Sequence, residues 1–181
     1  MILSDSELVE MLREPRTRRE GFAVLVKQYS EKLYWKVRRI VLSHEDANDV
    51  LQNVFIKVWN NLQNFQGKSS LSTWLYRIAI NESLDFLRKQ KMADMVSSDE
   101  DLSVSSRLMS DEYFDGDEIQ ARLQEAVARL PEVQRTVFNL KYFEEMKYSE
   151  MSQILNTSEG ALKASYHLAV KKITEYLHLF D

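Results

Sequence analysis

Apolar residues recur at three- and four-residue steps along most of the chain, the spacing that gathers them on one side of an α-helix. Such runs occupy residues 22–41, 47–62 and 162–177, with polar and charged residues between the apolar positions. Only 4 Gly and 2 Pro are present among 181 residues, too few for the many turns of a β-sandwich or barrel. The pattern therefore predicts an all-α protein.

Residues 1–91 are expected to form a first small domain of four helices. Ser4 and Glu7 have the spacing of a capping box before a short first helix, and a long second helix is predicted over 22–41. Ser43 is expected to cap a third helix that reaches residue 62, and a fourth begins near Ser72. The outward side of the second helix is expected to carry the cationic residues Lys27, Lys32, Lys36, Arg38 and Arg39.

Residues 118–181 are expected to form a second small domain, also of four helices. The first covers 119–130, and Pro131 takes the first position of the next, which runs to residue 143. Ser149 is expected to cap a short helix over 150–155, and Ser158 to cap a last helix that reaches about residue 178. A short helix, a three-residue turn and a longer helix are the spacing of a helix-turn-helix.

The net charge of −4 hides an uneven distribution along the chain. Residues 1–91 carry 15 Lys or Arg and 11 Asp or Glu, residues 92–119 carry 1 and 9, and residues 120–181 carry 8 and 8. So acidic a segment buries too little apolar surface to offset its ordering entropy, and residues 92–117 are therefore expected to be a flexible linker. The alternative is an ordered acidic loop that docks on one domain through Leu102, Val104 and Leu108.

The inventory of reactive side chains argues against an enzyme. The chain contains no Cys, and its three His residues, His44, His167 and His178, are far apart, so no disulfide or Cys/His metal site is indicated. Nucleophile motifs, Gly-rich phosphate loops and supported acid–base pairs are missing from the sequence. Neither a basic leader nor an apolar run of about 18 residues is found. We expect a cytoplasmic, non-catalytic protein with no metal, no cofactor and no membrane insertion.

The last predicted helix offers a candidate DNA-binding side. Lys163, Ala164, His167 and Lys171 are expected to point outward together. A helix fits the major groove of DNA, where Ser, His and Lys side chains meet base edges while lysines hold phosphates. The alternative is an ordinary lysine-rich helix surface that faces solvent.

Aromatic and polar residues gather in the first domain at a loop-to-helix junction (residues 65–81). They are Phe65, Lys68, Ser70, Thr73, Trp74, Tyr76, Arg77 and Asn81. Aromatic rings stack on unpaired bases, and hydroxyl, amide and guanidinium groups bind base edges or phosphates, so this set indicates contact with single-stranded or opened DNA. The alternative is that the aromatic residues belong to the core.

The third predicted helix has an acidic and amide side edged by large aromatic residues. This acidic-amide face consists of Asp46, Asp49, Gln52, Asn53, Phe55 and Trp59. An aromatic anchor with a polar rim is common in protein interfaces, and the charge of this one suits basic helices of a partner protein. The alternative is a helix side that is merely solvated.

Two sets of motifs resemble one family. The first set is Asp46-Ala-Asn-Asp49-Val-Leu-Gln52-Asn-Val-Phe55-Ile-Lys-Val-Trp59, then Thr73-Trp74-Leu75-Tyr76-Arg77-Ile78-Ala79-Ile80-Asn81 and Asp85-Phe-Leu-Arg88. It is similar to the second region of bacterial sigma factors of the extracytoplasmic-function (ECF) type, within the sigma-70 family. The second set is Leu130-Pro131-x-x-Gln134-Arg135, Tyr148-Ser-Glu-Met-Ser and Ser158-Glu-Gly160-Ala-Leu-Lys163. It resembles the fourth region of the same proteins, and the two sets occur in the family's order.

The resemblance implies a dissociable subunit that directs core RNA polymerase to promoter DNA and helps to open it. By similarity, the acidic-amide face would bind the clamp coiled coil of the largest polymerase subunit. The loop-to-helix junction would recognise and melt the minus-ten element. The minus-thirty-five element would be read by Ser158, Lys163, Ala164, Ser165, His167 and Lys171. An anti-sigma factor is a further expected partner, because this type is commonly held inactive by one.

The last helix departs from the family's usual pattern. Ala164-Ser165 stands where Ser-Arg is usual, which removes an expected phosphate or guanine contact, and Ala161-Leu162 stands where Thr-Val is usual. Asn156 replaces a common turn glycine, but Asn tolerates the left-handed conformation. Two other functions fit the residues taken alone: a free-standing helix-turn-helix regulator and a pure interaction adaptor.

Overall fold

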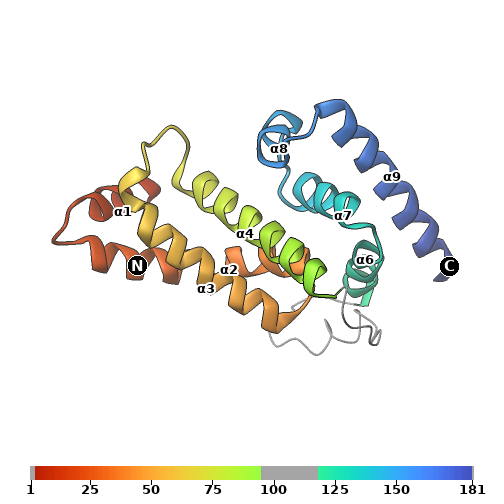
Figure 1. The fold of residues 1–181 in the computed structure, drawn as a ribbon, viewed down its shortest axis with the longest axis horizontal. Helices are drawn as coiled ribbons and strands as arrows, with labels where there is room; N and C mark the ends of the chain where they lie inside the picture. Colours follow the sequence, from red (N-terminus) through yellow and green to blue (C-terminus); the bar gives the residue numbers. More distant parts are fainter. Residues whose placement is uncertain (1–2, 95–117, 181) are drawn as a thin grey trace. The chain divides into compact units, whose positions relative to one another are not determined.

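The computed structural model describes residues 3–94 and 118–180, and every regular element within these ranges is a helix (Figure 1). The predicted all-α class is confirmed for this part of the chain. The chain divides into two compact units, Met1–Met95 and Val96–Asp181. Residues 95–117, which include most of the predicted linker, lie outside the described residues.

The first unit consists of α1 (Asp5–Arg13), α2 (Arg18–Val41), α3 (His44–Asn61), the short 3-10 helix η1 (Leu62–Asn64) and α4 (Leu71–Asp94). Helix α2 packs against α1, α3 and α4, and α3 also packs against α4. Their shared core is mainly aliphatic, with fully buried side chains that include Leu25, Leu33, Val54 and Leu75. Helix α4 extends three residues beyond the boundary predicted at residue 91.

Helix α1 closes on α2 through Leu8 and Leu12, which are 0% and 5% exposed. Its predicted capping box is present, since the Glu7 N–H donates to Ser4 Oγ and the Ser4 N–H donates to the Glu7 carboxylate. Gly21 allows α1 and α2 to approach closely, because a Cβ atom at this position would lie 2.8 Å from the Cβ atom of Met11.

The prediction that Arg38 lies on the outward side of α2 is wrong. Arg38 is only 3% exposed, and its guanidinium donates to the carbonyl oxygen of Leu42 at the end of the helix. Lys36 and Arg39 are half-buried, whereas Lys27 and Lys32 are exposed as predicted. The physical reason is that α2 contacts three other helices, so its buried surface is wider than the single apolar stripe that its sequence suggests.

The second unit consists of α6 (Glu118–Ala128), α7 (Glu132–Phe138), the π-helical segment η2 (Asn139–Phe143), α8 (Tyr148–Leu155), α9 (Glu159–Leu177) and the 3-10 helix η3 (His178–Phe180). Helix α9 packs against α6, α7 and α8. One core cluster is formed by residues from α6, α7 and α9 together with Leu130, among them Val127, Phe138, Ala169 and Ile173.

The helix-turn-helix of the second unit is formed by α8 and α9. Asn156 adopts the left-handed conformation at φ 49°, as its sequence position predicts, and ends α8. Ser158 caps α9, with the Ala161 N–H donating to Ser158 Oγ over 3.3 Å.

Two predicted helix starts in the second unit are wrong by a few residues. Pro131 is the N-cap of α7 instead of its first helical residue, and Ser149 lies inside α8 instead of capping it. Glu150 satisfies the start of α8 by accepting the Lys147 N–H at 3.2 Å. A cap can be formed by a neighbouring carboxylate as well as by a serine, and the sequence alone did not decide between them.

Candidate functional site

The acidic-amide face lies on the side of α3 that points away from the core. Asp49, Gln52 and Asn53 are exposed, whereas Asp46 is half-buried at one edge. Ile56 lies among them and is 58% exposed, although sequence reasoning missed it. Counting 100° per residue would have found Ile56, because it follows Gln52 and Asn53 by one helical turn. The face therefore has an apolar centre inside its polar rim.

Aromatic rings from two helices form the edge of this face. Phe22 of α2 packs edge-on against Trp59, with 5.0 Å between ring centroids, and against Phe55, with 6.4 Å. Trp59 remains 38% exposed, while Phe55 is half-buried. The contact with Phe22 holds the Trp59 ring and leaves much of its surface available to a partner.

The loop-to-helix junction (residues 65–81) is organised by a helix cap. The Thr73 N–H donates to Ser70 Oγ over 3.1 Å, and Ser70 Oγ donates to Thr73 Oγ1 over 2.8 Å. Both hydroxyls are thus used to start α4. Phe65 packs against Trp74 with 5.0 Å between ring centroids, and both rings are half-buried.

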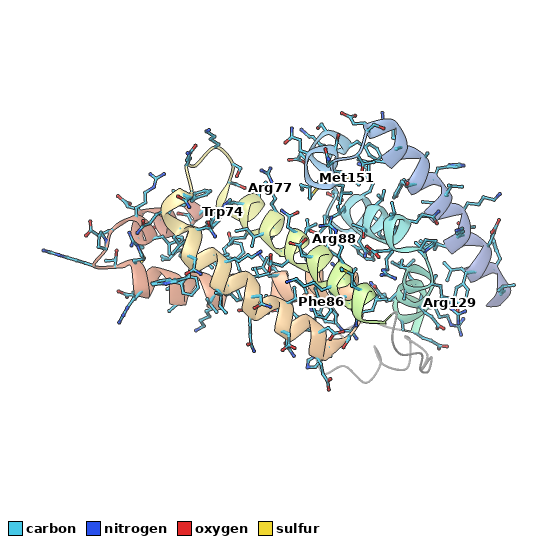
Figure 2. All side chains as sticks on the ribbon, in the orientation of Figure 1. Trp74, Arg77, Phe86, Arg88, Arg129 and Met151 are labelled. Carbon is cyan, nitrogen blue, oxygen red and sulfur yellow. The ribbon has the colours of Figure 1, made fainter. Side chains whose placement is uncertain are left out.

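Three of the predicted residues at the junction share the outer side of α4. Trp74, Arg77 and Asn81 follow one another at three- and four-residue steps, and Arg77 and Asn81 are exposed. Figure 2 shows Trp74 near the start of α4 and Arg77 further along it. Lys68 is exposed in the loop before α4, where Gly67 has a φ of 69°.

Tyr76 points to a different side of α4, toward α2. The Lys36 Nζ atom lies 4.0 Å from the centroid of its ring. Burial and, to a lesser extent, the positive charges of Arg39 and Lys32 together lower the pKa of Lys36 to about 8. Burial also raises the pKa of the Tyr76 hydroxyl. Tyr76 therefore lies on a different side of α4 from Trp74, Arg77 and Asn81.

Sequence reasoning missed a long-range contact at the start of α4. The Asp5 carboxylate of α1 accepts the Ser72 N–H over 3.3 Å and also accepts a hydrogen bond from the Tyr29 hydroxyl of α2. Burial, the hydrogen bond to Asp5 and the charge of Asp5 all raise the pKa of Tyr29. Because Asp5 and Ser72 are 67 residues apart, no local pattern signals this contact.

The outer side of α9 contains most of the residues predicted to meet DNA. Lys163, Ala164, His167 and Lys171 are exposed and share one side of the helix. Ser165 lies about 200° around the helix from Lys163 and is half-buried, so it does not share this side. Ser158 is exposed, and its hydroxyl caps the helix. Lys171 also lies 3.9 Å from the Glu175 carboxylate, an exposed pair of little energetic weight.

Two cationic side chains flank Tyr148 at the start of α8. The Nζ atoms of Lys141 and Lys163 lie 5.0 Å and 5.6 Å from the centroid of its ring. Lys141 also donates to the carbonyl oxygen of Met146 over 3.3 Å. The sequence prediction did not include Lys141 or Tyr148, because their contact with Lys163 joins η2, α8 and α9 and no local pattern signals it.

Arg135 has a structural role in the second unit. Arg135 Nη1 donates to the carbonyl oxygen of Ala128 at the end of α6 over 3.2 Å, and burial lowers the pKa of Arg135.

Within residues 3–94 and 118–180, no group of His, Asp and Glu could hold a metal ion. In the same ranges no helix is long and apolar enough to span a membrane.

Comparisons with known proteins match both units. The family model "Sigma-70 region 2" matches residues 25–92, and "Sigma-70, region 4" matches residues 120–173. The "ECF RNA polymerase sigma factor SigW" of Bacillus subtilis is 32% identical over 157 residues, which cover 82% of this chain and 84% of that protein. The "RNA polymerase sigma-H factor" of Pseudomonas aeruginosa is 31% identical over 182 residues, 96% of this chain and 93% of that protein.

Solved structures share the fold. The sigma factor RpoE of Bartonella quintana, in complex with the anti-sigma factor NepR, has a TM-score of 0.69 at 20% identity, covering 88% of this chain and 98% of that one. CnrH, in complex with the cytosolic domain of CnrY, has a TM-score of 0.67 at 21% identity, covering 98% and 99%.

The chain belongs to the sigma-70 family of RNA polymerase sigma factors. Within that family it is a member of the ECF type. It therefore directs core RNA polymerase to promoters and takes part in opening them for transcription initiation.

Proposed function

We propose that this sigma factor acts through three surfaces, two on the first unit and one on the second. The acidic-amide face binds the clamp coiled coil of core polymerase, the loop-to-helix junction captures the minus-ten strand, and the outer side of α9 reads the minus-thirty-five duplex. The proposal rests on the different side-chain chemistry of the three surfaces. An acidic rim around an apolar centre suits a protein, while the two other surfaces offer cations, amides and rings that suit DNA.

The polymerase contact rests on Asp49, Gln52 and Asn53 around Ile56. These side chains are exposed, and Ile56 supplies the apolar anchor that a polar face alone would lack. Trp59, held by Phe22, adds a large aromatic surface at the edge. Asp46 and Phe55 contribute mainly at the border, since both are half-buried.

The minus-ten contact rests on Trp74, Arg77 and Asn81, with Lys68 in the loop before them. A ring, a guanidinium and an amide on one side of a helix can stack on, and hydrogen-bond to, bases that have left the duplex. Ser70 and Thr73 act through the cap that starts α4. Phe65 supports the Trp74 ring, and Tyr76 supports the helix from its inner side.

The minus-thirty-five contact rests on Lys163, His167 and Lys171, with Ala164 between them. Lys141 joins Lys163 beside Tyr148, and these two lysines bind backbone phosphates at the edge of the groove. Ser158 and the free amides of the first turn of α9 add a further phosphate contact. Ser165 contributes to packing, since it lies off this side.

The factor itself supplies no reaction chemistry, which belongs to the polymerase, and it works in the cytoplasm where that enzyme acts. An anti-sigma factor regulates it. This is supported by the fold neighbour RpoE, which was solved in complex with an anti-sigma factor, and by exposed apolar side chains that a protein could cover, among them Val133, Leu168 and Val170.

Run-off transcription from a pool of genomic fragments tests the proposal. Core polymerase with this chain should initiate at a shared promoter sequence, and core polymerase alone should not. Initiation from no fragment would contradict the proposed function.

Asp49→Arg should weaken core binding about tenfold and leave the helical content unchanged, because Asp49 is exposed. Glu31→Arg, the same charge reversal at an exposed site on α2, is the matched control and should bind core normally.

A further inference from the structure

Helix α1 lies outside the residues that the region 2 family model matches, which begin at residue 25. It nevertheless touches the loop-to-helix junction (residues 65–81). It contacts α4 and η1 as well as α2. Near its end, Arg13 Nη2 would lie 3.5 Å from a Cβ atom placed on Gly67 in the loop. Helix α1 is thus a neighbour of the segment proposed to capture the minus-ten strand.

The Asp5 carboxylate of α1 links the start of α4 to α2. One carboxylate oxygen accepts the Ser72 N–H, and the other accepts the Tyr29 hydroxyl. The first N–H groups of a helix have no partner within the helix, and a negative charge beside them is favourable. Tyr29 is only 5% exposed, and its hydroxyl donates to Asp5 at the contact between α1 and α2. Asp5 therefore ties the first turn of α4 to a residue of α2 that is itself packed in the unit.

We propose that Asp5 is a positioning residue for promoter opening. By holding the first turn of α4, it sets the direction of the row formed by Trp74, Arg77 and Asn81 and the path of the loop before it. This inference rests on the proposed role of the junction in capturing the minus-ten strand. A displacement of about 1 Å in groups that must meet a reacting partner is enough to lower a rate severely.

The contact itself is tested first, on the full chain without polymerase. In Asp5→Ala, the Ser72 amide should exchange its hydrogen faster, because its acceptor is lost. The pKa of Tyr29 should fall toward its ordinary value, because the hydrogen bond and the charge of Asp5 both raise it. Glu10→Ala is the matched control, since it removes the same charge from an exposed position on the same helix. It should change neither quantity.

The functional test uses holoenzyme and a promoter obtained from the run-off experiment, with a fluorescent base in the minus-ten element. Asp5→Ala should leave core affinity within about twofold and slow opening of the duplex promoter about fivefold or more. On the same promoter with its minus-ten bases left unpaired, the defect should shrink to about twofold. Glu10→Ala should match the wild type on both templates. Asp5→Asn keeps the shape and one acceptor oxygen, and should give an intermediate defect even if Asp5→Ala fails to fold.

Opening of the duplex by Asp5→Asn and Asp5→Ala at the wild-type rate would overturn the inference. An equal defect on paired and unpaired templates would also overturn it, because Asp5 would then act on stability or on polymerase binding. The wild-type chain separates this inference from the proposed function. If the wild type opens no promoter, the proposed function fails; if it does and the variants match it, only the role of Asp5 fails.

Discussion

The starts of α4 and α9 are built alike but differ in what surrounds them. Ser70 caps α4 and Ser158 caps α9, each accepting a backbone N–H three residues further on. At α4, however, the Ser72 N–H is also taken by the Asp5 carboxylate from another helix. At α9, Gly160 is exposed, and a Cβ atom placed on it would meet no atom within 4 Å.

This difference matches two proposed modes of DNA contact. A helix start filled by an internal carboxylate does not offer its first amides to a phosphate, so α4 is left to act through its outward side chains. An open helix start can take a phosphate directly, as a helix in the major groove requires. The same serine cap can therefore start a helix whose first turn is occupied by a distant residue, as in α4, or one whose first turn is left open, as in α9.

Reversal of a charge near the start of α9 should have the strongest effect. Lys163→Glu should lower the affinity of holoenzyme for promoter DNA about tenfold or more, because the proposed phosphate contact would be replaced by repulsion. The slope of log affinity against log salt should fall by about 1. Fluorescence anisotropy across a salt series measures both quantities.

Lys172→Glu is the control for this experiment. Lys172 is also exposed on α9, but it lies about 180° around the helix from Lys163. Equal losses for the two variants would show that general charge is sensed, and the outer side of α9 would then have no special role.

The next prediction concerns the close packing of α1 on α2, which brings Asp5 to the start of α4. Gly21→Ala should destabilise the first unit by about 1–3 kcal/mol, because the new Cβ atom would lie 2.8 Å from Met11 Cβ and force the helices apart. Urea unfolding measures the loss, and hydrogen exchange should show it in α1. Ala23→Gly, at an exposed position of α2, is the control. It should lower the free energy of unfolding by only about 1 kcal/mol through helix propensity and leave the exchange of the Ser72 amide unchanged.

Local features of the fold were predictable from the sequence, and long-range ones were not. The caps by Ser4, Ser43 and Ser158 were predicted correctly, since each depends on residues within one helical turn. The burial of Arg38 was missed, because it depends on how many helices surround α2. The π-helical segment at 139–143 was missed as well, since it has the same apolar spacing as an α-helix over so short a length.

The candidate functional site likewise has features that follow from local sequence and contacts that do not. The outward positions on α3 and α9 follow from helical periodicity, and the exposure of Asp49, Lys163 and His167 agrees with it. Their binding roles remain predictions. The contact of Asp5 with Ser72 and the partnership of Lys36 with Tyr76 join different helices, so they required the folded structure to be seen.

A smaller effect is expected from the half-buried amine of Lys36 in the first unit. Lys36 has a pKa of about 8 in the folded chain, below its ordinary value, so the unfolded chain binds more protons above pH 8. Stability should therefore rise between pH 8 and about 9.5, by about 1 kcal/mol, since Lys36 is only half-buried and partly screened by solvent. Urea midpoints at the two pH values measure it.

Lys36→Met should remove this rise, and an unchanged rise in that variant would assign it to other groups. The measurement must stay below pH 10. Above that value the raised pKa values of Tyr29 and Tyr76 act in the opposite direction, because the unfolded chain loses the tyrosine protons first.

The smallest effect has the opposite sign to that of Gly21 and returns to the open end of α9. Gly160→Ala should stabilise the second unit by about 0.5–1 kcal/mol, because a new Cβ atom meets nothing and alanine loses less backbone entropy in a helix. Slower hydrogen exchange in α9, with exchange in α4 unchanged, would agree with this. Destabilisation by the same substitution would mean that the first turn of α9 is more crowded than its exposed surface indicates, and the contrast with α4 would fail.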